Sequence, residues 1–423
     1  MTKYIKCGGG GLPPQVLSDM DAVLNKKFGT STTYPSNTWP DLIRTMIPLP
    51  EKTASGSIAH FTDGADTVPL KSSKFYITPT QASGTPTPST PLPISGHTGL
   101  TATRTGVNLL PLLSWYNVGY SETNLGVTFE VVANGGIRIT GKTTGTYSQF
   151  NIVSYTTAPT TPHEFYMPNG TYTFSLSGIV DKIRLVISGS GNNGFPYSEV
   201  TYNAQSRTGT VTDGTKPFNY VILRIYSTDD NVDVTVYPQL EIGNTASEFE
   251  AYEGTTYPVS WTEEGTVFGG YYNSVTGELW RTYKEADMGD LSWIYTNSVF
   301  RGTLTDGVIL PSTQQGVIDF LCSSYLVKGS GNSSKWASDN LVAWHGTGSN
   351  CYIYVNDTNY NDADLFKTAV TGQKLVYELA TPVKVADLEE VEITSLLGVN
   401  NIWCDTGDCE VEYRVDIELS LNE

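Results

Sequence analysis

The chain has 423 residues and a formal net charge of −18 at pH 7, so free nucleic acid and anionic lipid are poor partners for it. The length exceeds what one hydrophobic core usually serves and indicates several domains. Charged residues are only 16% of the chain and aromatic residues 11%, alongside 41 glycines and 22 prolines, which excludes a disordered or collagen-like chain and predicts a mainly β fold.

The N-terminal sequence lacks a secretory signal. Residues 1 to 11 end in four glycines and contain neither an apolar core nor a small-residue cleavage site. No apolar run approaches the roughly eighteen residues that a membrane span requires. We therefore expect synthesis and retention in the cytoplasm, without membrane insertion.

Residues 1 to 52 predict a small helical segment. Apolar side chains recur every three or four positions from 14 to 28, and a shorter helix follows between Thr38 and Pro48. Two helices this short are not stable alone, so the pair is either a hairpin packed on the next domain or an anchor to a larger assembly. The candidate anchoring residues are Val16, Leu17, Met20, Val23, Leu24, Phe28, Trp39, Leu42, Ile43 and Met46.

Residues 53 to 107 predict an extended connector with two short strands, at 57 to 61 and 73 to 77. The run from 78 to 93 is rich in threonine, serine and proline, and proline does not enter a central strand. Such a composition favours extended, solvated chain. We interpret this part as a semi-rigid spacer.

Residues 108 to 252 predict a β-sandwich of the jelly-roll kind. Strand-length runs alternate with turn signals such as Asn169-Gly170 and Asp213-Gly214, and Val232 to Val236 alternates apolar with polar residues. The strands are expected at 127 to 132, 136 to 140, 172 to 176, 183 to 187, 220 to 225 and 232 to 237.

Residues 253 to 423 predict a second β-rich module. A hairpin is expected around residues 273 to 277, and the alternation from 411 to 419 predicts a final half-buried strand. Further strands are expected at 290 to 295, 317 to 321, 352 to 355 and 374 to 379, with a short helix at 362 to 370.

The sequence contains no recognisable catalytic set, metal site or cofactor motif. His60, His97, His163 and His345 lie far apart, outside any hydrolase or zinc-protease motif. The pairs Glu263-Glu264 and Asp287/Asp290 suit a glycosidase only if folding brings their carboxylates about 5 to 9 Å apart.

Two further motifs have structural alternatives. Cys404 and Cys409 are spaced for a hairpin disulfide, half a zinc site or a turn with free thiols. Residues 356 to 364 suggest a calcium loop but lack its glycine and glutamate, so a turn that caps the following helix is the alternative. The spacing of acidic residues along the chain does not support a calcium site near Glu241 or Glu248.

Aromatic residues in predicted turns are the candidates for ligand binding. Flat rings on loops bind sugars by their faces, whereas the alternative for each ring is core packing or a subunit contact. The candidates are Trp115, Tyr116, Tyr120, Tyr147, Phe195, Tyr197 and Tyr202 in the sandwich, and Trp280, Trp293, Trp336 and Trp344 beyond it. Position in ring-bearing turns favours Trp115, Tyr116, Tyr120, Phe195, Tyr197 and Tyr202 as the predicted ligand residues.

Several strings resemble modular virion structural proteins of tailed bacteriophages that infect gut Gram-positive bacteria. KCGGGGLPPQVLSDMDAVLNKKFG resembles their opening segment, and PQLEIGNTASEFEAYEGTTY is similar to the closing strand of a jelly-roll related to carbohydrate-binding modules. The connector and C-terminal portion are similar in SGSIAHFTDGADTVPLKS, PTPSTPLPISGHTGLTATRTGVNLLP, GTVFGGYYNSVTGEL, KLVYELATP and LLGVNNIWCDTGDCEVEYR.

The resemblance implies a non-enzymatic virion appendage of the tail-fibre, receptor-binding or baseplate type, which attaches to host-surface glycans. Its expected partners are capsid or tail proteins, bound through the N-terminus, and copies of itself, with a trimer as the expected form. A head fibre or capsid decoration protein is the alternative within this class. A polysaccharide hydrolase is the alternative from a different class.

Overall fold

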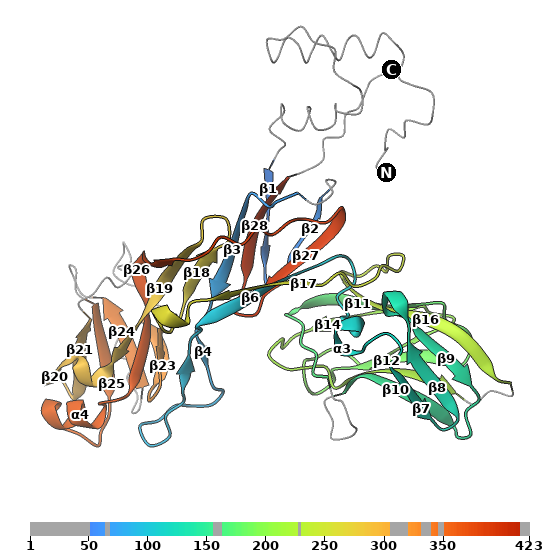
Figure 1. Cartoon of the computed structure of the whole chain (residues 1–423). Coiled ribbons are helices and arrows are strands. Elements are labelled where there is room, and N and C mark those ends of the chain that lie inside the picture. The colour runs from blue at the N-terminus through green and yellow to red at the C-terminus, as the bar shows by residue number, and fades with distance from the viewer. Residues whose placement is uncertain are drawn as a thin grey trace, which may run out of the picture.

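The computed structural model describes residues 51–63, 68–154, 163–226, 230–304, 320–330, 340–345 and 351–414. The chain is mainly β, as predicted, and its strands form several sheets in which the pairs are antiparallel except for β23 (Leu326–Ser330) with β24 (Asn340–His345) (Figure 1). The expected helical segment and its ten anchoring residues lie outside the described residues.

Two sheets form a unit that we call the body. The first has the order β1 (Glu51–Gly56), β28 (Cys409–Arg414), β3 (Ser72–Ile77), β18 (Gly270–Asn273), β19 (Glu278–Asp287), β26 (Lys374–Asp387) and β22 (Phe320–Cys322). The second has the order β17 (Thr255–Ser260), β6 (Gly99–Thr105), β27 (Gly398–Cys404) and β2 (Ala59–Asp63). Phe61, Phe75, Trp261 and Tyr272 are among the buried side chains of the body core.

The prediction of an extended connector at 53 to 107 is wrong. Strands β1 and β3 pair with β28, β2 pairs with β27, and β6 lies between β27 and β17. This segment therefore supplies about half of the buried residues of the body core, and its strands pair with the C-terminal strands. Between β3 and β6, the proline-rich run and the residues just after it lie outside these sheets and contain the two-residue strands β4 (Thr80–Gln81) and β5 (Ile94–Ser95).

The sandwich, residues 108 to 252, is inserted between two neighbouring strands of the body. Arg104 of β6 and Thr255 of β17 are register partners, so the chain leaves and re-enters the body at adjacent positions. One sheet has the order β10 (Tyr147–Ser154), β15 (Tyr220–Tyr226), β12 (Ile183–Ser188) and β13 (Ser198–Thr201). The other has the order β14 (Ser206–Val211), β11 (Gly170–Ser177), β16 (Val232–Ile242), β9 (Ile137–Gly141), β8 (Val127–Val131) and β7 (Ser121–Asn124).

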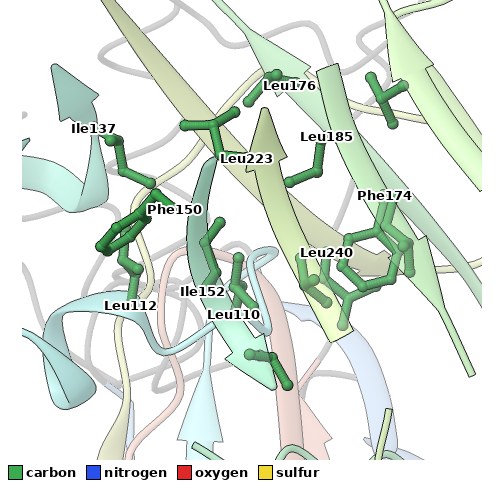
Figure 2. Packing of buried hydrophobic residues seen from close by; sticks show 14 of the residues in the cluster. Leu110, Leu112, Ile137, Phe150, Ile152, Phe174, Leu176, Leu185, Leu223 and Leu240 are labelled. Atoms are coloured by element: carbon green, nitrogen blue, oxygen red, sulfur yellow. The ribbon is translucent and has the colours of Figure 1, made fainter. Parts of the chain in front are cut away.

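The sandwich has a core of its own between these two sheets. Figure 2 shows Phe150, Leu185 and Leu223 from the first sheet among side chains that include Phe174 and Leu240 from the second. The chain passes repeatedly from one sheet to the other, as in a jelly-roll, and a one-turn helix, α3 (Leu112–Trp115), precedes β7. The predicted two-sheet sandwich is therefore present over its expected range.

The C-terminal region is divided between the body and a small module, which corrects the prediction of one unit from 253 to 423. Strands β19 and β26 pair along the body, and the described residues between them, apart from β22, form the small module. Its sheet has the order β20 (Ser292–Thr296), β21 (Val299–Leu304), β25 (Cys351–Asn356), β24 (Asn340–His345) and β23 (Leu326–Ser330). Helix α4 (Ala363–Ala369) places Phe366 in the core, with its ring centroid 4.0 Å from that of Phe300.

Candidate binding face of the sandwich

The sheet β10-β15-β12-β13 carries tyrosine and arginine on the side that faces away from the core. Alternate residues of its strands, such as Phe150, Leu185 and Leu223, are buried against the second sheet. Because side chains alternate along a strand, the intervening residues lie on the opposite side. This outer face comprises Tyr147, Gln149, Asn151, Arg184, Val186, Glu199, Tyr220, Ile222, Arg224 and Tyr226.

Two arginines lie over tyrosine rings on the outer face. The guanidinium carbon of Arg184 is 4.6 Å from the ring centroid of Tyr226, and that of Arg224 is 4.6 Å from the centroid of Tyr147. Attraction between a cation and the negative face of a ring stabilises this arrangement. The Nε of Arg224 also donates to Oε1 of Gln149 at 3.3 Å, so the long side chains are held across the strands.

Glu199 connects Tyr197 to this layer. Its carboxylate accepts from a terminal nitrogen of Arg184 at 2.5 Å and from the hydroxyl of Tyr197. Burial alone would raise the pKa of Glu199, but the bonds from Tyr197 and Arg184 outweigh burial and lower this pKa. The bond to Glu199, helped by burial, raises the pKa of Tyr197 to about 12, so at neutral pH the phenol donates and the carboxylate is charged.

An apolar pair lies beneath the polar side chains. Val186 and Ile222 are register partners on the outer face, and both are buried although they lie outside the core between the sheets. Neighbouring side chains therefore cover them. The outer face combines apolar contact, aromatic rings and charged hydrogen-bonding groups, the composition that suits a sugar or another polar ligand with apolar faces.

The six predicted ligand residues have different environments. Tyr197 and Tyr202 are exposed, by 54% and 53%, before and after the edge strand β13. Phe195 is fully buried, with its ring centroid 5.3 Å from that of Phe218, so its prediction as a ligand platform is wrong. The chain enters the core at Phe195 before β13 begins, which turn composition alone does not reveal.

The other three predicted residues form an aromatic cluster at the end of α3 and after it, in which Tyr116 is buried and Trp115 and Tyr120 are partly buried. Trp115 stacks on His163 with ring centroids 5.3 Å apart, and Tyr116 contacts Tyr120 and Phe150. Burial lowers the pKa of His163. Tyr116 is only 4% exposed, and its hydroxyl donates to the carbonyl of Asn151 at 3.0 Å, so Tyr116 packs in the core rather than presenting a face to a ligand.

The outer-face residues Tyr226, Arg184 and Arg224 are absent from the predicted set. Their signal was present in the alternation of Tyr220, Ile222, Arg224 and Tyr226 along β15. Buried residues alternate with them, and the sequence analysis predicted this segment only as a strand. A second surface row joins Tyr76, Tyr271 and Trp280 in register across three strands of the body, with neighbouring ring centroids 6.2 Å apart.

The two cysteine and calcium motifs have structural roles. Cys404 and Cys409 are buried free thiols, and burial raises their pKa values to about 11 and about 12. Asp362 caps α4 by accepting from the backbone of residues 364 and 365. The buried Asp357 accepts from Tyr325 and Asn359, each at 2.9 Å. Within the described ranges, no three His, Cys, Asp or Glu side chains are grouped to hold a metal ion.

The remaining acidic candidates also hold protein groups. Glu241 accepts from the amide of Gln239 at 3.0 Å and from the backbone of Ser247 at 3.0 and 3.1 Å. Asp287 accepts from the backbone of Gly289 and Gly372 at the entry to the small module. Glu263 and Glu264 lie in a turn of the body, at Thr262–Glu264.

Comparison of the chain with models of protein families gives no match, and comparison with curated proteins gives none either. Among solved structures, the VP2 subviral particle of infectious bursal disease virus is 9% identical with a TM-score of 0.09, and the alignment covers 97% of this chain and 89% of that chain. The Gx strain of that virus gives 7% identity and a TM-score of 0.10, with 88% and 84% covered. Similarity this low carries no argument.

No helix in the described part of the chain is long and apolar enough to cross a membrane.

Proposed function

We propose that this chain is a non-enzymatic appendage of a bacteriophage virion that attaches to glycans of the host surface through the sandwich. The observation that carries the proposal is the outer face, where Arg184, Arg224 and Glu199 lie among tyrosine rings. Rings pack against the apolar faces of sugars, and charged groups bind their hydroxyls. The phage assignment rests on the resemblance of the sequence strings.

The insertion of the sandwich supports a role in display. Because Arg104 and Thr255 are paired where the chain leaves and re-enters the body, the body sheets continue past the sandwich without interruption. A module joined in this way presents its surface while the rest of the chain contacts other virion proteins. The alternative within this class is a fibre or decoration protein that is located on the head of the virion rather than on the tail.

Glycan binding is tested by retention on wall polysaccharide purified from gut Gram-positive bacteria. We expect the full chain to be retained without releasing new reducing ends. The Tyr147→Ala and Tyr197→Ala variants should lose roughly five- to hundredfold in affinity, the range for loss of one aromatic stacking contact. Tyr295→Ala, which removes a comparably exposed tyrosine of the small module, is the matched control and should bind normally.

Two results would contradict this proposal. Release of reducing ends by the purified chain would identify a polysaccharide hydrolase. The second result is that the full chain is retained on no wall preparation, while the variants melt as the wild type does. That result would remove the attachment role and favour a decoration protein.

Virion attachment through the N-terminus, and self-association as a trimer, are further parts of the proposal. Deleting residues 1 to 50 should leave a folded protein that no longer joins virions, because β1 begins at Glu51 and its pairing with β28 is retained. Incorporation is measured by mixing the truncated protein with particles that lack it. Normal incorporation of a folded truncated chain would place the attachment site elsewhere.

A further inference from the structure

The outer face holds two like charges directly opposite each other. Arg184 of β12 and Arg224 of β15 are register partners in an antiparallel pair, so their side chains leave the sheet on the same side. Like charges at directly opposed positions destabilise a sheet. The sandwich keeps this pair although the chain as a whole is strongly acidic. A destabilising arrangement on an exposed face indicates a functional use of the charge.

Among the described residues, Arg184 forms a salt bridge and Arg224 forms none, although Glu199 also interacts electrostatically with Arg224. Glu199 accepts from Arg184 at 2.5 Å, with its remaining oxygen bound by Tyr197. Arg224 donates through Nε to the neutral amide of Gln149 and lies over the ring of Tyr147. Among the residues that the structure describes, no carboxylate forms a salt bridge with Arg224, and its terminal nitrogens donate to none of them. One positive charge therefore remains beside two aromatic rings.

We propose that the outer face binds a glycan with an anionic substituent, a carboxylate, sulfate or phosphate, whose charged group is bound by Arg224 while Tyr147 and Tyr226 contact the sugar rings. This inference rests on the proposed glycan binding and adds the ligand class. The planar guanidinium of arginine binds such oxyanions through two parallel hydrogen bonds. Arg184 is paired with Glu199 and is not the primary contact.

A polyanion such as nucleic acid fits this face less well. A single uncompensated guanidinium provides one strong anion contact, whereas nucleic-acid binding draws on many phosphate contacts. The net charge of −18 also repels a dense polyanion at long range. Glycans with isolated anionic groups require only the local charge that the outer face provides.

The test is an array of neutral, carboxylated, sulfated and phosphorylated glycans probed with the full chain. We expect binding to anionic glycans that weakens as salt is raised, and a loss of about ten- to hundredfold in Arg224→Gln, the range for a charged hydrogen bond. Arg224→Lys should retain more affinity than Arg224→Gln because it keeps the charge. Arg138→Gln is the matched control, since Arg138 forms a two-bond pair with Asp233 on the other sheet.

Melting temperature separates a ligand contact from a structural role. Arg224→Gln relieves the repulsion with Arg184 but loses the contact with the ring of Tyr147, so it should melt close to the wild-type temperature. A clear fall in melting temperature for both Arg224 variants, with equal loss of binding, would overturn the inference. Equal binding of neutral and anionic glycans would overturn the charge preference and leave glycan attachment standing. Binding to no glycan would remove the proposed function itself.

Discussion

Phe195→Ala should destabilise the sandwich by about 3–5 kcal/mol, whereas Tyr197→Ala, two residues further along, should cost less than about 1 kcal/mol. The ring of Phe195 is fully buried, with centroids 5.6 Å from Phe174 and 5.3 Å from Phe218. Its removal leaves a cavity that a close-packed core fills only in part. Tyr197 is more than half exposed, so its truncation loses one hydrogen bond to Glu199 and little packing.

Calorimetry of the full chain measures both variants, because the sandwich has a core cluster of its own and the affected transition identifies it. Phe195→Leu keeps most of the apolar volume and should fall between the wild type and Phe195→Ala, which provides a measurable variant if Phe195→Ala fails to fold. Equal destabilisation by Phe195→Ala and Tyr197→Ala would show that the edge of β13 is packed differently.

The sandwich was predictable from sequence because its strands and their partners are close along the chain. Strands β8 and β9, for example, pair around a three-residue turn at Ala133–Gly135, and the turn signal lies between two alternating runs. Local periodicity and turn residues therefore contain most of the information that such a unit needs.

The body was not predictable in the same way. Ala59 pairs with Ile402, and Ser73 with Val411, so the partners of the N-terminal strands lie more than three hundred residues away. A short strand whose partner is that distant has the same local composition as an extended linker. Only the complementary apolar faces reveal the pairing, and these are recognised once both strands are placed side by side.

The candidate site was predicted in part for a related reason. Loop position identified Tyr197 as an exposed ring but also selected Phe195, because turn composition does not indicate where the chain enters the core. Arg184 and Arg224 are forty residues apart along the chain, and their relation depends on the register of β12 against β15. Electrostatic conflict between strands is a property of that register and has no signature in either segment alone.

Excision of the sandwich should leave a folded body that has lost all retention on glycans. Replacing residues 106 to 253 with Asn-Gly would join β6 to β17 as a two-residue hairpin, since Arg104 and Thr255 are already register partners. The body core, which includes Phe75 and Trp261, is separate from that of the sandwich. The main losses are the bond from Asn401 to the carbonyl of Gly106 and the packing of Trp403 on the sandwich.

The excised chain is examined by circular dichroism and thermal melting, and by retention on the wall polysaccharides that bind the full chain. A cooperative transition should persist. As a control for native packing, Phe75→Ala truncates a buried ring of the body core and should lower the free energy of unfolding of the excised chain by about 3–5 kcal/mol. Retention by the folded excised chain would move the glycan site to the body, where the row of Tyr76, Tyr271 and Trp280 would be the surface to examine. A chain that melts without a cooperative transition would show instead that the body depends on the sandwich for its stability, and that contacts such as those of Trp403 join the two cores into one folding unit.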